Sequence, residues 1–205
     1  MEIFNSYLIS IIEQFYGITW LEFIGVFFAV LQVLFAKANK VWLYPCGIIS
    51  ICITSYLYFE IQLYAEILLQ LYYLIMSIYG WMLWKNKKGE GSEISLSSNS
   101  EKRKSILIVI GTFFFLYFIL IKHTNSDVPL WDAMVSAFAW AGMWLLAKRK
   151  IENWIYLNIS NLISIPLLLH KGLILYTLLT LFLFIIAIFG YLDWKKILKN
   201  KELLT

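Results

Sequence analysis

Seven apolar stretches, each long enough to cross a bilayer as a helix, constrain this chain more than any other feature. They cover residues 18–36, 41–59, 63–84, 105–121, 131–147, 153–169 and 172–194. A membrane-spanning helix needs about 17–25 predominantly apolar residues. Hydrophobic residues make up 61% of the chain, whereas soluble domains contain about 45–50%. A soluble fold of 205 residues could not bury so much apolar surface. We therefore predict an all-α integral membrane protein with seven transmembrane helices.

The basic residues of the connections predict how these helices are oriented. All but two of the 17 Lys and Arg residues lie in the connections that follow the first, third, fifth and seventh stretches. The exceptions are Lys122 and Lys171. Cytoplasmic loops of membrane proteins carry an excess of Lys and Arg. We therefore predict that the N-terminus lies outside and the C-terminus in the cytoplasm.

Three polar or amphipathic segments complete the predicted organisation. Residues 1–17 place apolar side chains at helical intervals and are predicted to be an interfacial segment. Residues 85–104 are rich in Ser, Gly and charge, a composition that cannot build a core, so we expect a flexible cytoplasmic loop. Residues 195–205 are predicted to be a cytoplasmic tail.

Two parts of the chain resemble each other. The first contains AKANKVWLYPCGIIS at 36–50 and YGWMLWK at 79–85; the second contains AKRKIENWIYLNISN at 147–161 and FGYLDWK at 189–195. Trp42 and Trp154 each precede a Tyr by the same interval, and small insertions or deletions align the rest. We predict two three-helix repeats, 18–84 and 131–194, joined by a connector helix at 105–121. Because a single connector helix crosses the membrane between them, both repeats enter the membrane from the same side. This is the 3+1+3 parallel arrangement of SWEET-like transporters.

The repeated segments also carry the signatures YAE…Q…YGWxxW at 64–84 and KIENW…KGLxLYT…GYxxW at 150–194. Together they resemble the PnuC family of bacterial vitamin transporters over roughly residues 18–196. The resemblance implies a homotrimer in the bacterial inner membrane that passes nicotinamide riboside by facilitated diffusion, with intracellular phosphorylation trapping the substrate. Thiamine and riboflavin are carried by relatives. The chain departs from the family pattern at Pro45-Cys46 and at Tyr156, near the expected pocket, so these differences bear on the vitamin rather than on the fold.

Polar side chains inside a bilayer are costly and usually face a cavity or another helix. Steps of three and four place a set of polar and aromatic residues of 63–84 on one helical stripe. Two Asn in 153–169 likewise share a face, two Trp in 131–147 are one turn apart, and one Tyr opens the last stretch. The predicted substrate-binding residues are Glu66, Gln70, Tyr73, Ser77, Trp81, Trp140, Trp144, Asn158, Asn161 and Tyr176.

These residue types suit a nucleoside-like ligand. Amides of Gln70 and Asn158 can bond to ribose hydroxyls and a carboxamide, and aromatic rings can stack on a cationic pyridinium. Each residue also has a structural alternative. Gln, Asn and Ser often hold membrane helices together, and Trp81 and Trp84 near a helix end could be interface anchors. We favour pocket lining for Gln70 and Asn158 because they occur in both halves of the repeat.

The sequence offers no enzymatic constellation. It contains no GxSxG, HExxH, P-loop or CxxC, and His123 and His170 have no metal-ligand pattern around them. We therefore predict no catalysis, no cofactor and no metal, with a small-molecule substrate and membrane lipids as partners. Nucleic acid is not expected, because the basic residues gather at one membrane interface. Without an ATP-binding motif, uncoupled diffusion of nicotinamide riboside is the simplest mechanism.

Three alternatives stay open at this point. A thiamine transporter of the same family would use a related site. A non-transporting sensor or scaffold would have a sealed, apolar bundle centre. A sugar carrier follows only from the SWEET-like architecture and is the weakest of the three.

Overall fold

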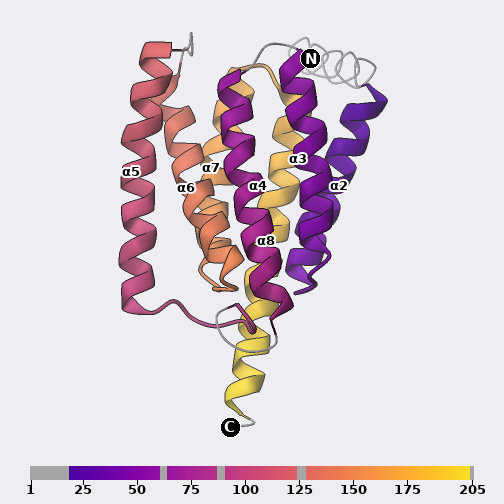
Figure 1. Cartoon of the computed structure of the whole chain (residues 1–205), viewed down its shortest axis with the longest axis vertical. Helices are drawn as coiled ribbons and strands as arrows, with labels where there is room; N and C mark the ends of the chain where they lie inside the picture. The colour runs from indigo at the N-terminus through magenta and orange to yellow at the C-terminus, as the bar shows by residue number, and fades with distance from the viewer. Residues whose placement is uncertain (1–18, 61–63, 87–90, 124–127, 204–205) are drawn as a thin grey trace, which may run out of the picture.

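The computed structural model describes residues 19–60, 64–86, 91–123 and 128–203, and these residues form seven α-helices (Figure 1). The predicted all-α, seven-helix fold is confirmed. The predicted interfacial segment 1–17 lies outside the described residues. The helices are α2 (Trp20–Lys37), α3 (Leu43–Glu60), α4 (Tyr64–Lys85), α5 (Asn99–His123), α6 (Pro129–Ala147), α7 (Asn153–His170) and α8 (Ile174–Glu202).

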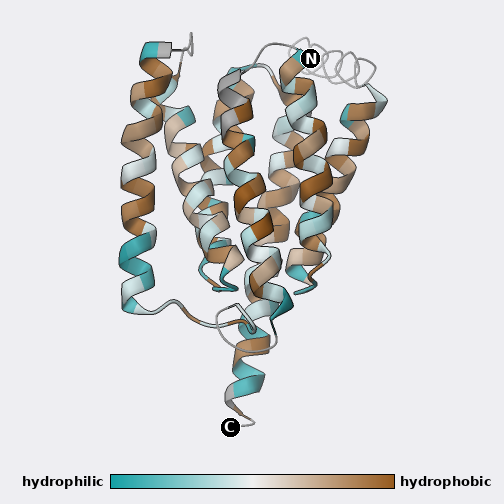
Figure 2. Cartoon of the chain, viewed as in Figure 1, coloured by the Kyte–Doolittle hydropathy of each residue, from teal (hydrophilic) through white to brown (hydrophobic). Residues whose placement is uncertain are grey.

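Five of these helices, α2, α3, α5, α6 and α8, are long and apolar enough to cross a membrane on their own composition. The other two, α4 and α7, are the helices that carry most of the predicted substrate-binding residues. Figure 2 shows apolar residues along the middle of the bundle, with hydrophilic residues at the start of α5 and along the end of α8. Large apolar side chains such as Phe114 and Phe118 of α5 are exposed, as expected for lipid-facing positions.

Local signals explain where two helices begin. Thr19 and Glu22 form a capping box at the start of α2, with the Thr19 side chain accepting from the Glu22 N–H. Ser98 and Glu101 bond to each other in the same way, so α5 begins at Asn99, ahead of the predicted residue 105. At the other end of the chain α8 continues to Glu202, beyond the predicted residue 194.

Six helices close a ring, and the seventh lies outside it. Around the ring, α2 contacts α3, α3 contacts α4, α4 contacts α6, α6 contacts α7, α7 contacts α8, and α8 returns to α2. The connector α5 packs on α6 outside the ring (Figure 1). Tyr156 of α7 and Ser105 of α5 share a hydrogen bond of 2.9 Å between their hydroxyls. The ring therefore consists of two triplets, α2–α4 and α6–α8, which meet at two seams, α4–α6 and α8–α2.

Within each triplet, the first two helices are joined by the same hydrogen bond. Ser50 of α3 donates to the carbonyl oxygen of Gly25 in α2 at 2.9 Å, and Ser160 of α7 donates to that of Val135 in α6 at 2.8 Å. Both bonds join residues 25 positions apart. The two triplets thus pack their first pair of helices alike.

The seams are also joined alike. Trp84 at the end of α4 donates its indole N–H to the carbonyl oxygen of Leu146 at 3.2 Å, and Trp194 of α8 donates to that of Ala36 at 3.1 Å. The sequence offset that relates Ser50 to Ser160 also relates Trp84 to Trp194 and Ala36 to Leu146. In each triplet, a Trp of the third helix therefore donates a hydrogen bond across the seam to the first helix of the other triplet.

One detail differs from the sequence alignment. The same offset pairs Trp154 with Tyr44 rather than with Trp42. The Tyr44 ring lies against Gly80 and the Trp154 ring against Gly190, whereas the Trp42 side chain is 65% exposed. The interval from Trp to Tyr that suggested the Trp42–Trp154 match does not correspond to a shared packing position.

Four aromatic side chains fill one end of the ring. We call this end, where residues 37–43, 85–86, 91–98 and 148–152 lie, the basic end. Tyr44 and Trp84 meet edge to face with centroids 5.3 Å apart, Trp154 and Trp194 do so at 5.6 Å, and Trp84 and Trp194 are 6.0 Å apart. All four are buried. Trp84 is therefore part of a core, which we call the aromatic cluster, and not the interface anchor that its position near a helix end suggested.

Candidate functional site

Two aromatic rings from different triplets stack in parallel at the α4–α6 seam. The rings of Tyr72 and Trp140 are parallel within 7° and their centroids are 3.9 Å apart. The Tyr72 hydroxyl donates to the main-chain carbonyl oxygen of Trp140 at 2.8 Å. The predicted residue Tyr73 lies beside this pair, with its ring centroid 6.0 Å from that of Tyr72. Stacking and hydrogen bond together fix the orientation of both planes.

Two buried polar atoms on the helices of this seam have no hydrogen-bond partner in the part of the chain that the structure describes. They are the indole N–H of Trp140 and the hydroxyl of Ser77. The Ser77 side chain is 1% exposed. A buried polar atom without a partner costs about 1–3 kcal/mol, and native proteins keep few of them. A donor on α6 and a hydroxyl on α4 are thus available to a ligand or to ordered water.

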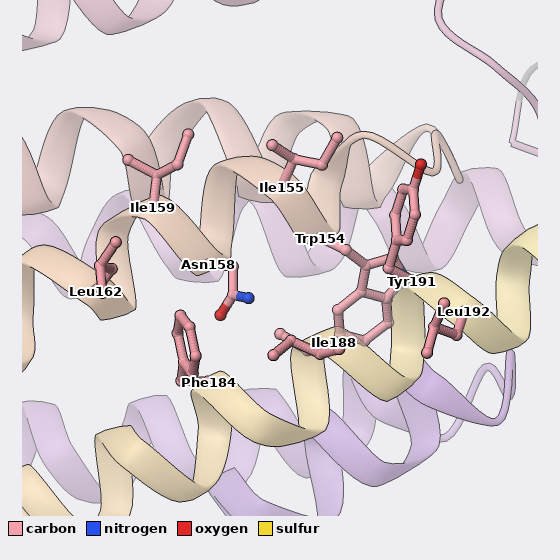
Figure 3. Close-up of a pocket in the computed structure, with 10 residues that line it drawn as sticks. Trp154, Ile155, Asn158, Ile159, Leu162, Phe184, Ile188, Tyr191 and Leu192 are labelled. Atoms are coloured by element: carbon pink, nitrogen blue, oxygen red, sulfur yellow. The ribbon is translucent and has the colours of Figure 1, made fainter.

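Asn158 lies elsewhere, at a cavity of about 330 Å³ between α7 and α8. Figure 3 shows its amide pointing between the two helices, toward Phe184 and Ile188. The rim of the cavity includes the exposed side chains of Ile155 and Leu162, so the cavity opens on the apolar outer face of the bundle. The Asn158 carbonyl oxygen is buried without a hydrogen-bond partner. Asn158 therefore lines a cavity, as expected, but one at the α7–α8 interface and not at a seam.

Two of the predicted Trp residues have a cation one helical turn away. The Lys85 ammonium lies 4.7 Å from the ring centroid of Trp81, and the Lys148 ammonium lies 4.6 Å from that of Trp144. Trp81 also packs against the aromatic cluster. Both Trp residues thus lie near the basic end, with one face occupied by a lysine. Their role in substrate binding stays a prediction.

The remaining predicted residues are spread over the bundle. Gln70 of α4 and Asn161 of α7 are half-buried, whereas Tyr176, in the first turn of α8, is 48% exposed. Glu66 belongs to α4, but its side chain lies outside the described part of the structure. The structure thus brings Trp140 and Tyr73 together through Tyr72, and leaves Asn158 and Tyr176 apart from that group.

Tyr72 was not among the predicted residues. The helical stripe of residues 63–84 selected Tyr73, and neighbouring positions on an α-helix point about 100° apart, at 3.6 residues per turn. Trp140 was predicted because it lies one helical turn from Trp144. Two adjacent Tyr residues in a membrane-spanning stretch were the available signal, but nothing in the sequence indicated which of them faces α6.

The electrostatic character of the site follows from the composition of the spans. Residues 20–36, 43–60, 64–84, 105–121, 129–147, 153–170 and 174–194 contain no Lys or Arg. Near the end of the bundle opposite the basic end, Asp132 and Lys171 form an ion pair at 2.9 Å. Among the described residues, no group of three or more His, Cys, Asp or Glu side chains could hold a metal ion. The spans can therefore offer aromatic faces and neutral hydrogen-bonding groups but no Lys or Arg, whereas the basic end holds a buried cation, Arg149.

Comparison with known proteins places the chain in a family of transporters. The family model described as nicotinamide mononucleotide transporter matches residues 19–196. The nicotinamide riboside transporter PnuC of Escherichia coli is 24% identical over 206 residues, covering 87% of this chain and 86% of that protein. The protein of the same name from Neisseria mucosa is 23% identical over 197 residues, covering 89% and 74%. A crystal structure of the vitamin B3 transporter PnuC superimposes with a TM-score of 0.72 at 18% identity, covering 95% of this chain and 88% of the other.

Proposed function

Because the chain belongs to the nicotinamide mononucleotide transporter family, we propose that it carries nicotinamide riboside across the membrane by facilitated diffusion. The family description names the phosphorylated compound, whereas the curated relatives are named for the riboside. The two substrates differ in charge. The riboside is a pyridinium cation, and the mononucleotide adds a phosphate of about −1.5 to −2 charges, as other phosphate monoesters do at neutral pH.

The absence of Lys and Arg from the membrane-spanning stretches is the observation that favours the riboside. Phosphate recognition in proteins relies on Arg, Lys or helix N-termini. With no Lys or Arg inside the spans, a phosphate dianion would have to cross the middle of the membrane with no partner for its charge. A pyridinium ring gains from an aromatic face, by about 0.5–2 kcal/mol depending on its hydration.

The Tyr72–Trp140 pair is the aromatic face that we propose for the pyridinium ring. It lies at a seam between the triplets, and the free indole N–H of Trp140 and hydroxyl of Ser77 supply polar partners for the ribose and carboxamide. Gln70, Tyr73 and Asn161 are the further residues that we propose to contact the substrate. We propose that Asn158 contacts the substrate at the mouth of the α7–α8 cavity.

The equivalent contacts of the two triplets support an internal repeat of the 3+1+3, SWEET-like type. In such carriers the halves rock against each other around a site near the midplane. We propose that the basic end is cytoplasmic, because cytoplasmic loops carry the excess of Lys and Arg. This places the C-terminus inside and residue 19 outside, in the inner membrane of a bacterium. Phosphorylation in the cytoplasm would trap the riboside, and a homotrimer is the proposed assembly.

Thiamine is the less favoured substrate, because the curated relatives are named for nicotinamide riboside. A sealed scaffold is also disfavoured, because partnerless polar atoms lie on the helices of a seam. The proposal is tested by uptake of labelled riboside into liposomes that contain the purified protein. We expect the label to equilibrate without ATP or an ion gradient, and excess unlabelled thiamine to compete weakly. Uptake no greater than that of empty liposomes would refute the proposal.

A further inference from the structure

Residues 91–98, which composition predicts to be flexible, are docked onto the loop between α6 and α7. Ser95 and Lys150 form a parallel β-bridge. The Ser95 N–H donates to the carbonyl oxygen of Arg149 at 3.1 Å, and the Ile151 N–H donates to that of Ser95 at 3.1 Å. The Ser97 N–H and hydroxyl both donate to the Glu152 carboxylate, at 2.9 and 2.8 Å. The expectation of a flexible loop over 85–104 is therefore wrong for this part.

The docked segment also reaches into the core of the basic end. Ile94 is 4% exposed and belongs to the same buried cluster as Trp84, Trp154 and Trp194. An aliphatic side chain of the docked segment is thus part of the buried core at the basic end. Releasing the segment would expose both the Ile94 side chain and part of the cluster.

Arg149 connects the segment to both triplets. It belongs to the loop of the second triplet, its guanidinium lies 3.8 Å from the ring centroid of Trp84 in the first triplet, and it donates to the carbonyl oxygen of Ser92. Arg149 is 8% exposed, and this burial lowers the pKa of its guanidinium, opposed by the negative charge of Glu93. At the other seam the corresponding residue is Asn39. Both have left-handed φ angles, 54° for Asn39 and 53° for Arg149.

We propose that residues 91–98 are a latch that holds the basic end closed and must undock from residues 148–152 whenever the carrier opens there. Gly91 lies against Leu83 of α4 in the first triplet, where a Cβ atom at position 91 would be 2.9 Å from the Leu83 Cβ. Ser95 and Ser97 bond to the loop of the second triplet, so the segment contacts both sides of the α4–α6 seam. Opening at this end separates the triplets, which breaks the contact of Arg149 with Trp84. The latch rests on the proposed transport function, since it acts on the alternation of that carrier.

A reversible crosslink across the β-bridge tests the latch. Paired backbones in a β-ladder lie about 4.8 Å apart, within the Cα separations of about 4.4–6.8 Å that a disulfide accepts. Ser95→Cys and Lys150→Cys would be combined in a protein that also carries Cys46→Ala and Cys52→Ala. Riboside uptake into liposomes is then measured for the oxidised and the reduced protein. Each single cysteine variant, treated with the same oxidant, is the control.

We expect oxidation to lower uptake at least tenfold in the double variant, dithiothreitol to restore it, and the single variants to be unaffected. Equal uptake by the oxidised and reduced double variant would show that the segment stays docked throughout transport and would overturn the proposal. Such a result would leave the transport function itself supported, because both forms would still carry the riboside.

Hydrogen exchange gives a second readout that needs no substrate. Residues that open as one unit share one opening free energy, so we expect the amides of Ser95, Ser97 and Ile151 to have equal protection factors once their intrinsic exchange rates are taken into account. The crosslink should raise all three protection factors. Arg149→Asn, which copies the residue at the other seam and suits the left-handed backbone, should lower them about tenfold. Unrelated protection factors, or no change in Arg149→Asn, would overturn the latch. If no form carried riboside while these exchange results held, the transport proposal alone would fail.

Discussion

Gly190 of α8 lies so close to Trp154 that a single methyl group should measurably destabilise the bundle. A Cβ atom at position 190 would lie 2.7 Å from Cη2 and Cζ2 of the Trp154 indole. Trp154 is 3% exposed and meets Trp194 edge to face, so its ring has little room to move. Overpacking of this kind costs about 1–3 kcal/mol, and replacing a helical Gly by Ala returns up to about 1 kcal/mol. Because the ring has little room to move, the cost lies in the upper half of that range, at about 2–3 kcal/mol, and the net loss for Gly190→Ala is about 1–2 kcal/mol.

For a chain of this length, 1 kcal/mol shifts the unfolding temperature by about 2–4 °C, so Gly190→Ala should lower it by about 2–8 °C. Thermal unfolding of the purified protein in detergent, followed by tryptophan fluorescence, measures this shift. Gly111→Ala in α5 is the matched control, because a Cβ atom there would meet nothing within 4 Å and should leave the unfolding temperature equal or higher. An equal response of the two variants would refute the close packing of α7 and α8 at Trp154.

Three further predictions concern the site and the connector. Trp140→Ala should weaken riboside binding by about 2- to 30-fold, which is the cation–π range converted to affinity, whereas Trp140→Phe should weaken it less. Calorimetry measures both affinities, and no loss in Trp140→Ala would show that this ring is not part of the site. Gln70→Ala and Asn158→Ala should each weaken binding by about 2- to 10-fold through a lost hydrogen bond, and changes in thermal stability alone would assign them to helix packing. Tyr156→Phe removes the hydrogen bond to Ser105 and should cost about 0.5–1.5 kcal/mol of stability, with unchanged riboside affinity. A stability equal to that of the unaltered protein would show that this bond does not hold α5 on the bundle.

The sequence predicted the seven helices because each apolar run is as long as a bilayer is thick. It misplaced the ends of two of them, since hydropathy reports only the part of a helix inside lipid. The start of α5 is set by the capping box of Ser98 and Glu101, and α8 continues to Glu202 through residues that are polar but compatible with a helix.

The docked segment 91–98 could not be predicted from its composition. Its order comes from bonds to Arg149, Ile151 and Glu152, which are far from it in the sequence. The partners of Trp84 and Trp194 are likewise distant, so an isolated Trp near a helix end looked like an interface anchor. Tyr72 shows the same limit, because helical periodicity finds a polar stripe but cannot tell which neighbouring helix each side faces.

The central claim is that the membrane-spanning stretches offer aromatic faces and no Lys or Arg, and therefore select a cationic riboside over its phosphorylated form. Calorimetric titration of the purified protein with nicotinamide riboside and with nicotinamide mononucleotide, under identical conditions, tests it most directly. We predict that the riboside binds at least tenfold more tightly. Equal or tighter binding of the mononucleotide would contradict the claim and would require a positive charge on the path that the membrane-spanning residues do not provide.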